Sequence, residues 1–179
     1  MMDGYRFSDG RLAVVTGAAS GIGRATALLL AARGAHVLGV DQNPAGLESL
    51  AQEAGTDNAI STLVLDLTQV DAGEQVKAAA RTSGAPWRIL VNNAGVGQAR
   101  SVLQTDNVEL ARIMDINLAA VFAMSRAATE VMGESGGGAI LNMSSIFGLI
   151  GTPNAGAYAA SKAALNGLTR QMAAEFGPL

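Results

Sequence analysis

Cysteine is absent from the 179-residue sequence, and His36 is its single histidine. A chain without cysteine can form neither disulfides nor thiolate metal sites. No cluster of histidine and carboxylate residues has the spacing of metal ligands, so we predict no metal site. His36 opens a predicted strand far from the candidate chemistry, and we expect it to have a structural place there.

Charge and long apolar runs are also scarce. Charged residues make up 15% of the chain and the formal net charge is −3, which gives no general attraction to nucleic-acid phosphates or anionic membranes. The longest apolar stretch, near residues 25–32, is too short to span a bilayer. Residues 1–11 lack the apolar segment of a secretory signal. We therefore expect a cytoplasmic protein that binds neither nucleic acid nor membranes.

Small and apolar residues dominate instead, with 22 glycines and 49% hydrophobic residues. At this length we expect one domain over residues 1–179, large enough to bury a core. The predicted strands are 12–16, 36–40, 60–65, 89–91 and 139–143, and the predicted helices are 22–33, 44–54, 70–82, 106–132 and 155–176. This alternation predicts an α/β fold with a doubly wound parallel sheet, a three-layer α/β/α Rossmann-type arrangement whose strands are covered on both faces.

A glycine-rich turn, TGAASGIG, follows the first predicted strand and opens the first helix. Such glycines permit a tight turn and let backbone N–H groups approach a pyrophosphate at the helix N-terminus. Isolated glycine patterns are often plain turns, but the order of strand, glycines and helix is the context that a dinucleotide site requires. The residues that we expect to bind the cofactor here are Gly17, Ser20, Gly21, Ile22 and Gly23.

Asp41 ends the second predicted strand, 18 residues after Gly23. A carboxylate at this place accepts hydrogen bonds from the adenosine ribose hydroxyls and repels a 2′-phosphate. Capping of the next helix is the alternative. No basic residue follows Asp41, Ser20 occupies the turn position from which a basic side chain could bind that phosphate, and Arg24 is expected to point along the helix start. The sequence therefore favours NAD over NADP.

Polar and small residues also follow the third and fourth predicted strands. Asp66 and Leu67 offer a carboxylate and a backbone N–H to the adenine edge, although capping of the next helix explains Asp66 as well. Asn93, Ala94 and Gly95 end the fourth strand, where open parallel sheets bind ligands. The small residues leave room for the cofactor, and the Asn93 side chain can also tie neighbouring strands together.

Tyr158 and Lys162 lie four positions apart in the last predicted helix, so their side chains share one face. A nearby ammonium favours the ionised phenol, which lets a tyrosine act as acid or base near neutral pH. An exposed tyrosine beside a solvated lysine is the alternative. Ser145 follows the fifth strand at the cofactor edge and can donate to a substrate oxygen. Asn117 stands inside the long helix, where asparagine indicates either a polar task or a surface position.

The whole pattern resembles the short-chain dehydrogenase/reductase family, in its compact single-domain branch. The resemblance extends over essentially all of the sequence, and the motifs fall in the order that the family shows. The residues that carry it are Thr16, Gly17, Gly21, Gly23, Asp41, Asp66, residues 92–95, Asn117, Ser145, Tyr158 and Lys162.

The resemblance implies an oxidoreductase that transfers hydride between NAD(H) and a secondary alcohol or ketone. Tyr158 would exchange a proton with the substrate oxygen, and Ser145 would polarise and position that oxygen. Lys162 would hydrogen-bond the nicotinamide ribose and favour the ionised form of Tyr158, so both residues would also contact the cofactor. Asn117 would hold a water in a proton relay. The particular substrate does not follow from the sequence.

The sequence departs from the family pattern after its last predicted helix. Family members continue through a sixth strand, a substrate-covering loop and a seventh strand, which this sequence lacks. Strand 139–143 would then lie at a sheet edge, where unpaired backbone groups favour aggregation or pairing with another chain. A cofactor-binding module that does not catalyse is therefore the alternative function. Helices 106–132 and 155–176 resemble those through which the family forms homodimers and homotetramers.

Overall fold

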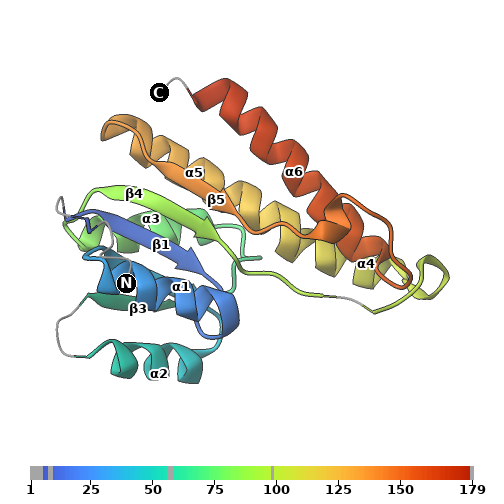
Figure 1. Cartoon of the computed structure of the whole chain (residues 1–179), viewed down its shortest axis with the longest axis horizontal. Helices are drawn as coiled ribbons and strands as arrows, with labels where there is room; N and C mark the ends of the chain where they lie inside the picture. Colours follow the sequence, from blue (N-terminus) through green and yellow to red (C-terminus); the bar gives the residue numbers. More distant parts are fainter. Residues whose placement is uncertain (1–5, 8–9, 56–58, 98, 178–179) are drawn as a thin grey trace.

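Parallel strands form the sheet of the protein in the computed structural model, which describes residues 6–7, 10–55, 59–97 and 99–177 (Figure 1). The strands are β1 (Leu12–Thr16), β2 (His36–Asp41), β3 (Ile60–Val64), β4 (Trp87–Asn92) and β5 (Ala139–Asn142). They lie in the order β3-β2-β1-β4-β5, and each neighbouring pair is parallel. The strand order reverses between β1 and β4, and ligands bind outside the carboxyl ends of the strands at such a point. The predicted doubly wound sheet is confirmed.

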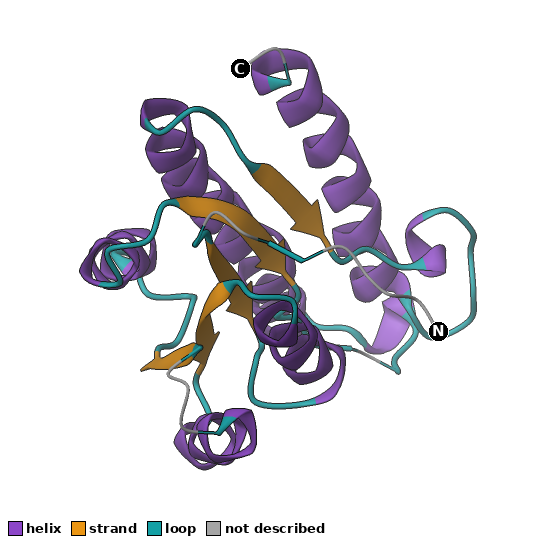
Figure 2. Cartoon of the chain, turned by 60° about the vertical axis from the view of Figure 1, so that its left-hand side comes forward, coloured by secondary structure: helices purple, strands orange, loops and turns teal. Residues whose placement is uncertain are grey.

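Helices form layers on both faces of this sheet (Figure 2). The helices are α1 (Gly21–Ala32), α2 (Pro44–Ala54), α3 (Ala72–Thr82), α4 (Asn107–Met114), α5 (Ala120–Glu134) and α6 (Gly156–Phe176), with short 3-10 turns η1 (Val102–Gln104) and η3 (Ile146–Gly148). Buried residues of α1 and α2 share one apolar cluster, and those of α3 and α5 share another. The arrangement is the predicted α/β/α sandwich.

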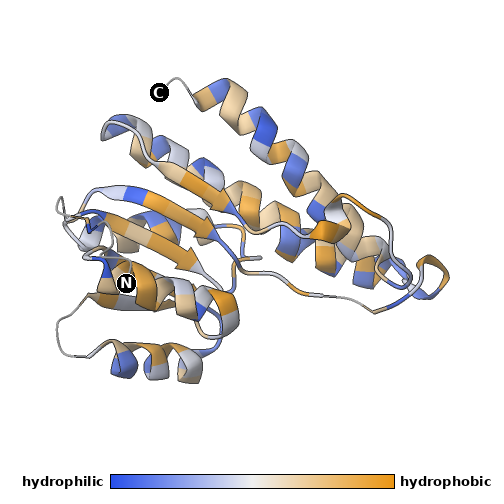
Figure 3. Cartoon of the chain, in the orientation of Figure 1, coloured by the Kyte–Doolittle hydropathy of each residue, from blue (hydrophilic) through white to orange (hydrophobic). Residues whose placement is uncertain are grey.

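The central strand β1 is buried along its whole length. Leu12 and Val14 belong to the cluster with α3 and α5, whereas Ala13 and Val15 belong to the cluster with α1 and α2. Alternate residues of a strand point to opposite faces, so a strand covered on both sides is apolar along its length, and Thr16 at the end of β1 is buried with its hydroxyl hydrogen-bonded. The hydrophobic colouring of β1 and its neighbours in Figure 3 follows from this double coverage.

The prediction that every strand is covered on both faces is wrong for the two edge strands. In β3, Thr62 and Val64 are exposed, and in β5 the exposed residues are Ala139 and Leu141. Ile140, between the last two, packs against the cluster that contains α5. The helical layers end at the margins of the sheet, so an edge strand is only partly covered. β5 pairs with β4 on one side, as expected for an edge strand.

The helix predicted over residues 106–132 is not a continuous α-helix. α4 ends at Met114, a π-helical segment, η2 (Asp115–Ala119), follows, and α5 then runs to Glu134. A π-helical turn contains an extra residue and is frequent at functional sites. The wider turn contains Asn117, whose side chain is bound to the backbone of a neighbouring loop. The break between α4 and α5 therefore coincides with a tertiary contact of Asn117, and no feature of the local sequence marks it.

Polar side chains bind α6 to η3 and to β5. Asn166 donates from Nδ2 to the Gly148 carbonyl at 3.3 Å, and Asn142 of β5 donates to Thr169 Oγ1 at 2.9 Å. A cavity of about 240 Å³ lies between α5, β5 and α6.

Within the described ranges, no helix has the length and apolar character needed to cross a bilayer. Pro178 and Leu179, which follow the last helix, lie outside the described residues.

Candidate active site

The glycine turn brings α1 directly onto the end of β1. Gly17 and Gly21 have φ angles of +67° and +55°, which side-chain-bearing residues rarely adopt. Position 23 requires glycine for a different, steric reason, because a Cβ there would lie 2.2 Å from the Gly17 carbonyl oxygen. The first turn of α1 therefore packs against the backbone of Gly17, and the helix N-terminus opens at the switch point of the sheet. Ser20 is its exposed N-cap residue.

Asn93 ties the end of β4 to this turn. Its Nδ2 donates to the Thr16 carbonyl at 3.1 Å and to the Gly17 carbonyl at 3.3 Å. Thr16 Oγ1 accepts the backbone N–H groups of Asn93 and Ala94 at 3.0 and 3.1 Å, and donates to the Val91 carbonyl. The tie predicted for Asn93 is present. Thr16 belonged to the motif but had no predicted role, although its place at the strand end, before the first glycine, was a usable signal.

A cavity of about 350 Å³ opens at this point, and most of the predicted cofactor residues line it. Its lining comprises Gly17, Ser20, Gly21, Ile22, Asp41, Gln42, Leu65, Asp66, Leu67, Thr68, Asn93, Ala94, Gly95, Val96 and Ile116. Glycine backbone, the N-terminus of α1 and two carboxylates are the groups that a dinucleotide needs. Gln42, Leu65, Thr68 and Val96 adjoin predicted residues in the chain. Ile116 comes from the π-helical segment and gave no sequence signal.

Asp41 bridges the glycine turn and the start of α2. Its Oδ2 accepts the Ala19 N–H at 3.1 Å, and its Oδ1 accepts the Asn43 N–H at 3.0 Å. The alternative of helix capping is not what the structure shows, because Asn43 is the N-cap of α2 and its Oδ1 accepts the Gly46 N–H. Both turns meet at the carboxylate, which stands at the wall of the cavity.

Asp66 forms a local turn with Thr68. Its Oδ1 accepts the Thr68 N–H at 2.9 Å and the Thr68 hydroxyl at 2.8 Å. These two bonds stabilise the carboxylate and lower the pKa of Asp66 below its ordinary value. The N-cap of α3 is Asp71, so Asp66 does not cap that helix.

Arg24 lies along α2, away from the cavity lining. Its guanidinium donates to the carbonyls of Gly46 and Ser49 at 3.3 and 3.2 Å and pairs with the Glu53 carboxylate. These three partners all belong to α2, so the side chain joins the two helices on that face of the sheet. Among the described residues that line the cavity, none is lysine or arginine.

Lys162 is buried next to Gly95 and Tyr158. Its side chain Nζ donates to the Met143 carbonyl at 2.7 Å and lies 5.7 Å from the centroid of the Tyr158 ring. A Cβ on Gly95 would come within 3.5 Å of the same Nζ, so Gly95 leaves the space that the amine occupies. Burial disfavours the charged amine and lowers the pKa of Lys162. The alternative of a solvated lysine is wrong, because Lys162 is only 5% exposed.

Phe147 connects Ser145 with Tyr158. The Phe147 N–H donates to Ser145 Oγ at 3.2 Å, and the Phe147 ring packs edge-on against the half-buried Tyr158 ring at 6.5 Å between centroids. Ser144 is turned the other way and donates to the Lys162 carbonyl at 3.0 Å. Ser144 and Phe147 therefore bind the segment after β5 to α6 at Lys162 and Tyr158, and the predicted Ser145 lies between them in the chain.

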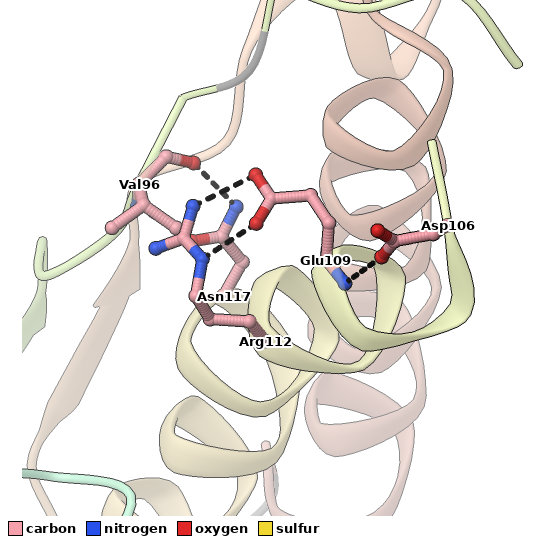
Figure 4. Close-up of polar contacts among 5 residues, drawn as sticks. All are labelled: Val96, Asp106, Glu109, Arg112 and Asn117. Atoms are coloured by element: carbon pink, nitrogen blue, oxygen red, sulfur yellow. Dashed lines mark hydrogen bonds and ion pairs between the residues drawn. The ribbon is translucent and has the colours of Figure 1, made fainter. Parts of the chain in front are cut away.

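Asn117 is fully buried, so the alternative of a surface asparagine is wrong. Its Oδ1 accepts the Val96 N–H at 2.8 Å, and its Nδ2 donates to the Val96 carbonyl and to Ser161 Oγ, both at 3.0 Å. Figure 4 shows the bond from the Asn117 amide to the Val96 carbonyl. Asn117 thereby joins the loop after β4 to α6, one residue from Lys162. Its side-chain amide has both N–H groups engaged.

α4, which leads into this segment, has a well-defined start. Asp106 caps it by accepting the Glu109 N–H at 2.8 Å, and Arg112 donates to both oxygens of Glu109 at 2.8 and 2.9 Å (Figure 4). The two bonds from Arg112 lower the pKa of Glu109. Local contacts of this kind set the helix that precedes Asn117.

The fold and the cavity define a Rossmann-type nucleotide-binding protein, and comparison with known proteins is more specific. The family described as short chain dehydrogenase matches residues 11–179. The chain is 39% identical over 170 residues to galactitol 2-dehydrogenase (L-tagatose-forming) of Cereibacter sphaeroides, covering 94% of this chain and 66% of the relative. It is 35% identical to the 3-oxoacyl-[acyl-carrier-protein] reductase of Escherichia coli, covering 93% and 68%.

Solved structures agree. A short chain dehydrogenase/reductase family protein superposes with a TM-score of 0.88 at 34% identity, over 95% of this chain and 70% of that protein. A 4-hydroxyisoleucine dehydrogenase complexed with NADH superposes with a TM-score of 0.85 at 33% identity, over 94% and 68%. The chain belongs to the short-chain dehydrogenase family, whose members are oxidoreductases that bind NAD(P). It spans about two thirds of the length of these relatives.

Proposed function

We propose that the protein binds NAD(H) in the 350 Å³ cavity and oxidises a secondary alcohol or reduces the corresponding ketone. The observation that carries the proposal is the burial of Lys162 between Gly95, at the cavity wall, and Tyr158. A buried amine beside a phenol at a cofactor cavity is an arrangement for moving a proton at a substrate oxygen. The substrate we expect is a small-molecule alcohol or ketone.

The distribution of charge supports NAD over NADP as the cofactor. Asp41 supplies a carboxylate at the cavity wall, which suits ribose hydroxyls and opposes a 2′-phosphate. The described lining offers no cationic side chain to such a phosphate, and Arg24 is bound to α2. A solved relative that carries NADH supports the same choice.

The bound nicotinamide would supply or accept the hydride, and the chain's own residues would handle the proton. Tyr158 would give a proton to the substrate oxygen or take it away. Lys162 would hold the nicotinamide ribose and favour the ionised phenol. Ser145 would orient the oxygen, because its hydroxyl accepts the Phe147 N–H and keeps its own proton to donate.

The remaining cofactor contacts fall to three groups of residues that line the cavity. The glycine turn with Ser20 and Ile22 would hold the pyrophosphate, Asp66 and Leu67 the adenine, and residues 93–95 the central part. For Asn117, whose amide is committed to Val96 and Ser161, we propose that any water of a proton relay binds its main chain in the π-helical segment.

Binding and turnover together test this proposal. Fluorescence titration with NADH should show saturable binding, and NAD-dependent turnover should appear on some member of a panel of secondary alcohols. Binding without turnover on every member would instead favour the non-catalytic module, and absence of NADH binding would contradict the proposal altogether.

We further propose that residues 1–179 form one cytoplasmic domain that assembles as a homodimer or homotetramer through α4, α5 and α6. The apolar side chains of Val108, Phe122 and Phe176 support this assembly, because they are 80%, 52% and 41% exposed on these helices. Exposed large apolar side chains on neighbouring helices are typical of an interface.

A further inference from the structure

Gly46 lies in the first turn of α2, outside the cavity lining, yet it is the point where α2 meets the glycine turn. A Cβ on Gly46 would lie 2.7 Å from the Ala19 Cβ and 3.0 Å from the Ala19 carbonyl oxygen. The first distance is shorter than a methyl group tolerates, and the second is tight enough that the Ala19 carbonyl would have to shift by a few tenths of an ångström. Gly46 is not among the described glycines with positive φ, so its backbone conformation is open to any residue. The missing side chain, rather than the backbone, is what this position requires.

Ala19 has little freedom to move away from Gly46. It is 7% exposed, and its N–H donates to Asp41 Oδ2 at 3.1 Å. The preceding residue, Ala18, is fully buried and donates its N–H to the Val40 carbonyl at 3.2 Å. The backbone of the glycine turn is thus bound to the end of β2 at two successive residues.

The contact closes a ring around the Asp41 carboxylate. Gly46 touches Ala19, Ala19 donates to Asp41 Oδ2, Asp41 Oδ1 accepts the Asn43 N–H at 3.0 Å, and Asn43 Oδ1 accepts the Gly46 N–H at 3.1 Å. Arg24 holds the same turn of α2 by donating to the Gly46 carbonyl. An added methyl group at position 46 must therefore displace α2 or the glycine turn, and either movement disturbs the two bonds that fix the carboxylate.

We propose that Gly46 is a positioning residue for the adenosine end of the cofactor, acting through Ala19 and Asp41 on the preference for NAD over NADP. The inference rests on the proposed function, because it assumes that NAD occupies the cavity beside Asp41. Gly46 touches no cofactor atom in this account. It lets α2 pack closely enough for the Asp41 carboxylate to be held at the ribose position.

The variant Gly46→Ala tests this proposal, because helix propensity and the packing against Ala19 predict opposite effects of the substitution. Alanine is the better helix former, so helix propensity alone predicts an equal or more stable protein. We expect instead that the Kd for NADH rises about tenfold, the effect of disturbing one hydrogen bond to a charged group. The Kd for NADPH should change less, so the ratio of the two affinities narrows, while kcat at saturating NAD stays near the wild-type value.

Two variants control the experiment. Gly133→Ala makes the same chemical change in α5, where the added Cβ would meet no atom within 4 Å apart from the helix's own nearby backbone, and should leave the Kd for NADH within about twofold. Ala19→Gly combined with Gly46→Ala removes the nearer of the two contacts, the 2.7 Å approach to the Ala19 Cβ, and leaves the 3.0 Å approach to the Ala19 carbonyl oxygen. The double variant should therefore recover a large part of the lost NADH affinity. If Gly46→Ala alone does not fold, the double variant still carries the test and should fold and bind.

Three results would overturn the inference: unchanged NADH affinity in Gly46→Ala, an equal loss in Gly133→Ala, or a double variant no better than Gly46→Ala. Thermal unfolding without cofactor separates this inference from the proposed function. A wild-type protein that binds no NADH would overturn both the function and the assigned role of Gly46. The packing ring itself still predicts a lower unfolding midpoint for Gly46→Ala, recovered in large part in the double variant.

Discussion

Lys162 is the one ionisable side chain among the buried residues that the structure describes. Its amine is buried beside Tyr158 and Gly95 and has the Met143 carbonyl as its hydrogen-bond acceptor, without a carboxylate among its described partners. Burial of a cation without a counter-charge disfavours its charged form, which is why the pKa of Lys162 is lowered. A residue kept at such a cost is expected to have a role in binding or chemistry.

The pH dependence of stability tests this burial. Because the pKa of Lys162 is lower in the folded protein, the cost of burying the charge is fully present below the folded-state pKa. The cost is relieved as the pH rises towards the ordinary value for lysine. Lys162→Met should therefore raise the free energy of unfolding at pH 7, and the gain should shrink by pH 10. Urea unfolding at both pH values measures it, and a constant gain would contradict the account.

The place of individual residues could be predicted where their chemistry is local to the sequence. The spacing of Tyr158 and Lys162 placed them on one helix face, and Asp41 at a strand end was expected at the cofactor site and lines the cavity, while its contact with a ribose stays a prediction. Sequence could not decide whether Asn117 is buried or exposed, because its partners Val96 and Ser161 are brought to it by tertiary packing. The close packing of Gly46 could not be predicted for the same reason, because its neighbour Ala19 lies in the glycine turn, far from it in the sequence.

At the scale of elements, one hydroxyl joins β1 to the segment after β4. Thr16 Oγ1 accepts two backbone N–H groups, from Asn93 and Ala94. Valine has nearly the same shape but no acceptor, so Thr16→Val leaves both donors unpaired in a largely buried place. We expect a loss of about 2 kcal/mol in the free energy of unfolding, together with weaker NADH binding. Urea denaturation and fluorescence titration measure the two effects.

Thr129→Val provides the matched control. The Thr129 hydroxyl donates to the Ser125 carbonyl within α5 and accepts no described backbone N–H, so its removal leaves no donor unpaired. The variant should lose less than about 1 kcal/mol and bind NADH as the wild type does. Equal losses in the two variants would show that the hydroxyl of Thr16 does not organise the cofactor turn.

Most elements could be predicted from the apolar pattern because parallel strands covered on both faces are apolar along their length. The apolar pattern did not predict the features that depend on tertiary packing. The π-helical segment around Asn117 leaves the apolar periodicity of the long helix intact, so nothing local marks it. The exposure of Thr62 and Leu141 depends on where the helical layers end, which strand composition does not record.

For the whole molecule, the proposed assembly makes a clear prediction. Phe122 on α5 is 52% exposed, and Leu29 on α1 is 57% exposed on the opposite face of the sheet. Phe122→Glu should convert a dimer or tetramer into a monomer, because a charge cannot be buried in an apolar interface without a partner. Leu29→Glu makes a similar change outside the proposed interface and should keep the wild-type state. Sedimentation velocity distinguishes these outcomes, and an unchanged assembly of Phe122→Glu would place the interface elsewhere.

The central claim is that the Tyr158 hydroxyl, beside buried Lys162, moves the proton while the cavity holds NAD. Tyr158→Phe keeps the ring that packs edge-on against Phe147 and removes that oxygen alone. The most direct measurement is therefore kcat for NAD-dependent alcohol oxidation, with the Kd for NADH measured on the same protein. We predict a loss of about 10²-fold to 10⁴-fold in kcat, the usual contribution of a general acid or base, and a Kd within about threefold of wild type. Wild-type kcat in Tyr158→Phe would contradict the account.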